Sequence, residues 1–259
     1  MATRSSGFSS NDRMQKGSKL MEMRKIGLIG GMSFESSAVY YRMVNEAVRE
    51  RLGALHSAEV LLHSVDFQKI VELQKAGRWD EAAGRLSEVA RALQSGGADC
   101  VLICTNTMHL IADAVAASVD IPLINIIDET ALRLKDAGSR RPLLLATRYT
   151  MEHGFYAERM RAHGIDVIVP DADGRKLTHE VIFDELCAGK VLDASREALM
   201  ALIEKAKAEG ADAVILGCTE ICLILDPANL PLPGFDSTAI HAEAAVDFAL
   251  LDRKVVRAA

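Results

Sequence analysis

The stretch VLICTNTMH, residues 101–109, places a cysteine where a run of apolar residues turns polar. A short apolar run of this kind predicts a buried strand over residues 99–104, with a helix starting directly after it. The stretch VILGCTEI, residues 214–221, has the same form. Both stretches follow the triplet Gly-Ala-Asp, which indicates an internal repeat whose two copies carry Cys104 and Cys218 at equivalent strand ends.

Patterns typical of strands and of helices alternate along the chain, which indicates an α/β fold with mainly parallel sheets. The expected strands cover residues 25–31, 58–67, 99–104, 121–126, 141–147, 165–170 and 212–218. The expected helices cover residues 33–51, 78–95, 150–163, 195–209 and 238–251. Because the pattern restarts near residue 141, we predict two similar three-layer α/β domains with parallel sheets. A pseudo-two-fold axis relates them, and the active site lies in the cleft between them.

The chain of 259 residues is long enough for two such domains. We expect the first to comprise residues 24–125 plus 236–259, because the last helix can return to the first half. The second then comprises residues 126–235. Residues 1–23 are polar and rich in serine and glycine and lack the apolar stretch of a secretory signal, so we expect a disordered leader there.

The composition is that of a soluble globular protein, with 49% hydrophobic residues, 25% charged residues and a formal net charge of -6. No long basic run and no apolar run of membrane length occur, so we expect neither nucleic-acid binding nor membrane binding. Five cysteines, without the pattern of a small secreted protein, favour the reducing cytoplasm. No CxxC pair occurs, so we predict no metal site and expect Cys100, Cys187 and Cys222 to be structural.

The two repeated cysteines are each expected at the carboxyl end of a strand, where open α/β sheets bind ligands. The helix start that follows binds carboxylates and lowers the pKa of a thiol. The plain alternative is that both are buried small hydrophobes, as most free cysteines are. Two thiols across one cleft suit two-base proton transfer, in which one removes the α-proton of an amino acid and the other returns a proton to the opposite face. Asn106, Thr107 and Thr219 are then expected to hold the α-carboxylate.

Four stretches, GLIGGMSFESS, HSAEVLLHSVDF, CTNTMH and GCTEI, resemble the aspartate/glutamate racemase family. The match is closest to the bacterial branch that includes broad-specificity amino-acid racemases, and it spans about residues 24–250. The resemblance implies an enzyme that needs no pyridoxal phosphate or other cofactor, has catalytic cysteines at Cys104 and Cys218, and is usually a homodimer. Some members replace the first cysteine with threonine and act on one enantiomer. This chain keeps both thiols, so we expect action on both enantiomers.

Further residues are expected to contact the substrate. The resemblance implies that the loop containing Met32 and Ser33 borders it. Thr147 occupies the strand end equivalent to that loop and is expected to contact the carboxylate. Thr105 and Glu220 follow the two cysteines in the same helix-start setting and complete the expected substrate-binding set.

Two basic residues are candidates for binding a side-chain carboxylate of the substrate. Family members specific for aspartate use an arginine after the first helix and a lysine in the second domain. The stretch RERLGALH offers Arg49 and Arg51, and DGRKLTHE offers Arg175 and Lys176; of these, Arg51 and Lys176 are the candidates. The plain alternative is that both are solvated surface charges. His109 follows the Cys104 turn at helical spacing and is expected to support that cysteine.

These observations together predict an isomerase that racemises amino acids, either aspartate and glutamate or a broader set. Another reaction on the same scaffold stays open, such as hydantoin racemisation, maleate isomerisation or arylmalonate decarboxylation. A protein of two lobes that closes on a ligand without chemistry is a further alternative. The paired thiols favour the racemase, because binding alone needs neither.

Overall fold

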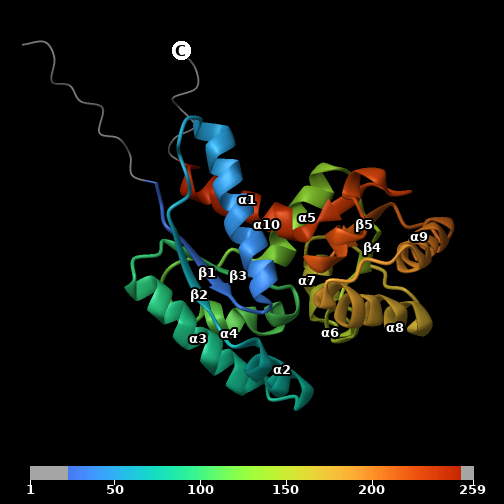
Figure 1. The fold of residues 1–259 in the computed structure, drawn as a ribbon, viewed down its shortest axis with the longest axis horizontal. Helices are drawn as coiled ribbons and strands as arrows, with labels where there is room; N and C mark the ends of the chain where they lie inside the picture. Colours follow the sequence, from blue (N-terminus) through green and yellow to red (C-terminus); the bar gives the residue numbers. More distant parts are fainter. Residues whose placement is uncertain (1–22, 252–259) are drawn as a thin grey trace, which may run out of the picture.

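The computed structural model of the chain describes residues 23–251. The expected leader over residues 1–23 therefore lies outside the described residues, apart from Met23. Within the described range, the chain forms two parallel three-stranded sheets with the orders β2-β1-β3 and β4-β5-β6 (Figure 1). The strands are β1 (Ile26–Gly30), β2 (Val60–Ser64), β3 (Cys100–Ile103), β4 (Pro142–Leu145), β5 (Ala213–Leu216) and β6 (Gly234–Asp236). The predicted α/β fold with parallel sheets is confirmed.

Helices precede and follow these strands in both halves. The α-helices are α1 (Phe34–Leu52), α2 (Phe67–Lys75), α3 (Trp79–Ser95), α4 (Ala112–Ala116), α5 (Ile126–Asp136), α6 (Arg148–Glu152), α7 (Phe155–Ala162), α8 (Ala172–Glu180), α9 (Asp193–Ala208) and α10 (Ser237–Ala249). Short 3₁₀ turns are η1 (Thr107–Ile111), η3 (Leu186–Ala188), η4 (Glu220–Leu223) and η5 (Pro227–Asn229), and a π-helical turn is η2 (Val181–Glu185). No helix in the described range is both long and apolar enough to cross a membrane.

The first sheet is covered on both faces because alternate residues of each strand point to opposite sides. Ile26 and Leu28 of β1 pack with α1 and α10, together with Leu102 of β3. Val101 and Ile103 of β3 pack on the other side, against α3 and its neighbours. Figure 1 shows α1 and α10 on one side of this sheet and α2, α3 and α4 on the other. Burial on both faces explains why β1 and β3 are uninterrupted apolar runs.

The second sheet is built by the same rule. Leu143 of β4 and Val214 of β5 face α9. Leu144 of β4 and Ile215 of β5 face α5 and α7. α10 begins directly after β6 and then packs beside α1 on the first sheet, so the last helix returns to the first half. The exact division into domains, including residues 252–259 beyond the described range, stays a prediction.

Two predicted strands are wrong. Residues 121–126 and 165–170 each make a single bridge to a neighbouring strand, Val101 to Leu123 and Leu143 to Ile168. The first of these segments is short because α5 already begins at Ile126. In addition, the helix predicted over residues 150–163 is divided into α6 and α7 by Gly154, whose φ is 79°. Helices α2, α5 and α8 and strand β6 were not predicted at all.

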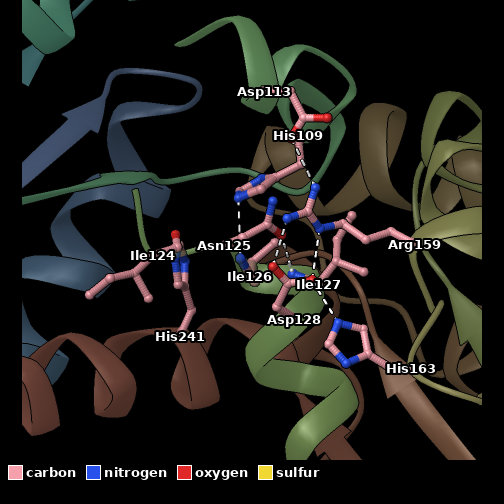
Figure 2. Close-up of polar contacts among 10 residues, drawn as sticks. All are labelled: His109, Asp113, Ile124, Asn125, Ile126, Ile127, Asp128, Arg159, His163 and His241. Carbon is pink, nitrogen blue, oxygen red and sulfur yellow. Dashed lines mark hydrogen bonds and ion pairs between the residues drawn. The ribbon is translucent and has the colours of Figure 1, made fainter. Parts of the chain in front are cut away.

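The segment that joins the two halves is held by polar contacts rather than by a strand ladder. His241 of α10 donates from Nε2 to the Ile124 carbonyl at 2.8 Å. Arg159 of α7 donates two hydrogen bonds to the Asp128 carboxylate, each 2.7 Å, and a third of 3.0 Å to Asp113. Figure 2 shows this arrangement, with the segment lying between His241 on one side and Arg159 on the other. α4, α5, α7 and α10 are thereby tied together at the boundary between the two sheets.

The turn after β1 requires glycine at one position. Gly31 has a φ of 89°, and a Cβ there would overlap the backbone of Val65. Gly77 also has a positive φ, 66°, but a Cβ there would meet nothing within 4 Å. Replacing each glycine by alanine therefore distinguishes two losses of stability. At Gly77 the loss comes from the backbone conformation alone, whereas at Gly31 the steric overlap adds to it.

We predict that Gly31→Ala lowers the free energy of unfolding by more than about 3 kcal/mol, because it adds a steric clash to the left-handed backbone conformation. Gly77→Ala should cost only about 1 kcal/mol, since the strain there is conformational alone. Urea denaturation followed by circular dichroism measures both. Equal losses for the two variants would contradict the close approach of residue 31 to Val65.

Candidate active site

One cavity lies where the carboxyl ends of the strands of both sheets meet. Each of the six described strands is followed by at least one residue that lines it. The lining residues are Met32, Ser33, Ser36, Phe67, Gln74, Thr105, Asn106, Thr107, Thr147, Tyr149, Ile182, Phe183, Cys187, Gly217, Cys218, Thr219, Glu220 and Thr238. This is the edge at which open parallel sheets bind ligands. Nine of the twelve residues predicted for the site are among them: Met32, Ser33, Thr105, Asn106, Thr107, Thr147, Cys218, Thr219 and Glu220.

The Glu220 carboxylate is the polar centre of one wall. Its Oε2 accepts a hydrogen bond from the Cys218 thiol at 2.9 Å and from the Thr219 hydroxyl at 2.6 Å. Its Oε1 accepts from the Ser33 hydroxyl at 3.1 Å. Ser33 is also the N-cap of α1, where its Oγ accepts from the Ser36 backbone N–H. The two loops that follow β1 and β5 are therefore joined across the cavity by one carboxylate.

The Cys218 thiol is half-buried and lines the cavity. Desolvation raises its pKa well above the usual value, and the adjacent Glu220 charge raises it further. The thiol is therefore a proton donor in the structure at neutral pH. Its bonding partner is a carboxylate that can accept its proton.

Cys104 lies directly behind the cavity. It is 1% exposed, and the next residue, Thr105, is the one that lines the cavity. Ser36, also a lining residue, donates to the Cys104 carbonyl at 3.3 Å. Burial raises the pKa of the Cys104 thiol, which packs among apolar residues of the α1 and α10 layer, with Tyr40 and Ile124 among them. This thiol too is protonated at neutral pH.

Hydroxyl and amide groups form the opposite polar wall. The hydroxyls of Thr107, Thr147 and Thr150 contact one another at 3.0, 3.1 and 3.1 Å. Asn106 is 4% exposed and donates from Nδ2 to Ser237 Oγ at 3.1 Å. Its Oδ1 is buried without a hydrogen-bond partner. Because a buried acceptor without a partner is costly, this oxygen suits a ligand that brings an N–H or O–H donor.

Two buried histidines hold the backbone behind Cys104. His109 Nδ1 must carry the proton, because it contacts the Thr105 carbonyl at 2.8 Å, and its Nε2 accepts from the Ile126 backbone N–H at 3.2 Å. His241 donates from Nε2 to Ile124, so its Nδ1 accepts from the Tyr40 hydroxyl at 2.9 Å. Desolvation lowers the pKa of His109 to about 4 and that of His241 to about 3. Both rings are therefore neutral, which their hydrogen bonds require. Figure 2 shows both rings against the segment that joins the two halves.

Arg51 and Lys176 do not lie in the cavity wall. Arg51 stands near the end of α1 and pairs with Asp247 of α10 at 2.6 Å. Lys176 of α8 lies 3.9 Å from Glu180, and its side chain is 72% exposed. The structure therefore does not bring either residue to the other predicted site residues.

Several lining residues were missed by sequence reasoning. Phe67 and Gln74 belong to α2, and Ile182 and Phe183 belong to η2, elements that the apolar pattern did not reveal. Cys187, expected to be structural, is exposed and lines the cavity. Its position follows from a short turn after η2 that carries no sequence signal for a site.

The sequence matches a known family and a known relative over most of the chain. The pattern of the Asp/Glu/Hydantoin racemase family matches residues 29–245. The broad specificity amino-acid racemase RacX of Bacillus subtilis is 21% identical over 226 residues, which cover 85% of this chain and 96% of that protein.

Solved structures agree with this match. A Yersinia pestis protein provisionally called an Asp/Glu racemase superposes with a TM-score of 0.84 at 48% identity, covering 88% of this chain and 100% of its own. An aspartate racemase homologue from Pyrococcus horikoshii gives a TM-score of 0.79 at 34% identity, covering 88% and 99%. Glutamate racemase from Aquifex pyrophilus, at 18% identity and a TM-score of 0.56, shares the fold.

The fold is that of an α/β protein with two parallel sheets and a cavity at the carboxyl ends of their strands. The chain belongs to the Asp/Glu/Hydantoin racemase family. The resemblance stated from the motifs is confirmed.

We predict that the protein loses stability as the pH falls from about 6.5 toward 4. Unfolded histidine binds a proton near pH 6.5, whereas folded His109 does so only near pH 4. The unfolded state therefore gains protons first, so the stabilisation is complete above pH 6.5 and is lost as the pH falls. For His109 the loss is on the order of 3 kcal/mol. Urea denaturation at pH 7.5, 6, 5 and 4 measures it.

The matched variants are His109→Gln and His56→Gln. His56 is exposed, so its replacement should leave the slope of stability against pH unchanged. His109→Gln should be less stable at pH 7.5 but should show a shallower slope between pH 6.5 and 4. Parallel curves for His109→Gln and the unchanged protein would show that the buried ring is not the source.

Proposed function

We propose that the protein racemises amino acids without a cofactor, by two-base proton transfer between Cys104 and Cys218. The observation that carries the proposal is the placement of the two thiols. Cys104 directly follows β3 and lies behind the cavity at the strand ends, whereas Cys218 follows β5, the central strand of its sheet, and lines that cavity. Membership of the racemase family supports the same reaction class.

The substrate's α-ammonium and α-carboxylate have complementary groups in the cavity. The unpartnered Asn106 Oδ1 is an acceptor, and an ammonium group has three donors to offer it. The Thr107 and Thr147 hydroxyls can turn their protons toward a carboxylate, which then accepts in place of their mutual contact. These donors would stabilise the charge that develops on the carboxylate when the α-proton leaves.

The proton path starts at Cys218 in one direction of the reaction. Its thiol passes a proton to Glu220 Oε2, 2.9 Å away, and becomes a thiolate. The thiolate takes the α-proton, and the electron pair of the C–H bond stays on the α-carbon beside the carboxylate. The Cys104 thiol then donates its proton to the opposite face of that carbon. Glu220 returns its proton through solvent to regenerate the Cys104 thiol, and the reverse direction exchanges the roles of the two cysteines.

The raised pKa of both thiols fits a resting enzyme in which neither is charged. Arrival of a positively charged α-ammonium group beside them would favour the thiolate. The proposal also requires the Cys104 thiol, now 1% exposed behind Thr105, to face the bound substrate.

The finer features of the enzyme belong to the same proposal. Independence from pyridoxal phosphate, action on both enantiomers, assembly as a homodimer and a cytoplasmic location are supported by the family resemblance and by the cysteine content. Light scattering of the purified protein would test the dimer.

We predict that Cys104→Ala and Cys218→Ala each lower kcat for racemisation by at least about 1,000-fold, since each removes one of the two acid/base groups. The readouts are exchange of the α-proton in D₂O by NMR, over a panel of D- and L-amino acids, and chiral chromatography of the products. If both single variants still interconvert enantiomers, the two-base assignment is wrong.

Cys100→Ala and Cys222→Ala are the matched controls, since each lies four residues from a proposed catalytic thiol and does not line the cavity. Both should keep kcat within a few-fold. A comparable loss in these variants would attribute the effect to general disruption of the fold. Exchange with no amino acid, together with turnover of a hydantoin or an arylmalonate, would assign the scaffold to one of those reactions.

A further inference from the structure

The charges that line the cavity bear on which amino acids it accepts, provided that the protein is the racemase proposed above. We propose that the substrates are amino acids whose side chains carry no carboxylate, that is, neutral and cationic ones, in preference to aspartate and glutamate. The determinant is the charge of the walls that the substrate side chain would meet.

The inner cavity has no cationic wall. Among its lining residues in the described range, Glu220 alone is charged, and none is lysine, arginine or histidine. The surface away from the polar wall is largely apolar, with Phe67, Tyr149, Ile182 and Phe183. A carboxylate on the substrate side chain would face either this apolar surface or the Glu220 carboxylate. Both are unfavourable for a negative charge.

Two aromatic residues of the apolar surface, Tyr149 and Phe183, are held by ring contacts, one of which joins the two halves. The Tyr149 ring meets Trp79 of α3 edge-on, with 6.3 Å between the ring centroids, and stacks on His153 at 5.7 Å. His179 packs against Phe183 at 4.6 Å. Side chains held on several sides do not turn away easily to admit a distant cation.

An outer cavity continues the inner one and is acidic. Ser33, Ser36, Phe67, Cys187, Thr219 and Glu220 line both. The outer cavity, of about 710 Å³, adds Glu35 and Asp66, and no described lining residue is lysine, arginine or histidine. Lys69 lies 3.8 Å from Asp66 and offsets that charge. Glu35 is the remaining added carboxylate, so a side chain that extends outward meets further negative charge.

The basic residues that are candidates for pairing with a substrate carboxylate form ion pairs with other residues. Arg51 binds Asp247 at 2.6 Å, and Lys176 lies 3.9 Å from Glu180. Arg148, next to the lining residue Tyr149, lies 4.0 Å from Glu152. A buried carboxylate without a partner is strongly disfavoured, and the hydroxyl wall has already been assigned to the α-carboxylate.

Matched pairs of amino acids isolate this effect. Glutamate and glutamine, like aspartate and asparagine, have nearly the same shape and differ in the side-chain charge. We expect kcat/KM for α-proton exchange to be at least 10-fold higher for glutamine than for glutamate, and likewise for asparagine over aspartate. The measurement uses the full chain in D₂O with NMR detection.

The outcomes separate this inference from the proposed function. Exchange of glutamate or aspartate at a rate equal to or above that of its amide overturns the inference and leaves the racemase proposal standing. Exchange with no amino acid in a broad panel overturns the racemase proposal, and the inference falls with it.

A charge reversal at the outer cavity provides the second test. Glu35→Lys should raise the ratio of kcat/KM for glutamate over glutamine by at least 3-fold, because it replaces a repelling charge with an attracting one. Glu46→Lys is the control, since Glu46 is exposed on the same helix and lines neither cavity. An unchanged ratio in Glu35→Lys, or an equal rise in Glu46→Lys, would overturn the role of the outer cavity.

Discussion

The structure depends on one constraint, which is that both parallel sheets are covered by helices on both faces. Residues at alternating positions of β3 or β5 then enter two different apolar clusters, and nearly every side chain on these strands is buried. Polar groups on such strands would lose hydration without compensation. Functional groups can emerge only beyond the strand ends, where the backbone leaves the sheet. The shared cavity lies at that edge.

A small number of long-range hydrogen bonds join the two halves of the chain at this edge. The Ser33–Glu220, Asn106–Ser237 and Thr107–Thr147 hydrogen bonds each join segments that are far apart in the sequence. Below the cavity, neutral histidines and the Arg159–Asp128 pair fix the segment between the two halves. Although desolvation alone would raise the pKa of Asp128, hydrogen bonds from Arg159 and His163 hold it below its usual value. The shape of the cavity therefore depends in part on residues that do not line it, such as His109 and Arg159.

The charge states of the groups in and behind the cavity follow from their burial. Burial keeps both thiols protonated, and a single carboxylate on the wall is placed to take a proton from one of them. In the proposed substrate preference, the same carboxylate repels a second negative charge. The two proposals therefore meet in one group, Glu220. The sequence around the cysteines does not reveal this, because it depends on Arg51 and Lys176 lying away from the cavity.

The sequence by itself determined the ends of several strands and nine of the residues that line the cavity. Apolar runs of fixed length, each followed by small polar residues, located β1, β3, β4 and β5, and the repeat around Cys104 and Cys218 showed which ends belong together. These are local signals, set by periodicity and by helix capping. The segments at residues 121–126 and 165–170 were predicted as strands because they are apolar, yet each makes a single bridge, and the first already gives way to α5 at Ile126. Only the tertiary structure decided that Arg51 and Lys176 lie elsewhere, that Cys104 sits behind the wall and that α2 and η2 supply the apolar surface. Those outcomes depend on contacts between distant segments, and local sequence patterns carry no record of them.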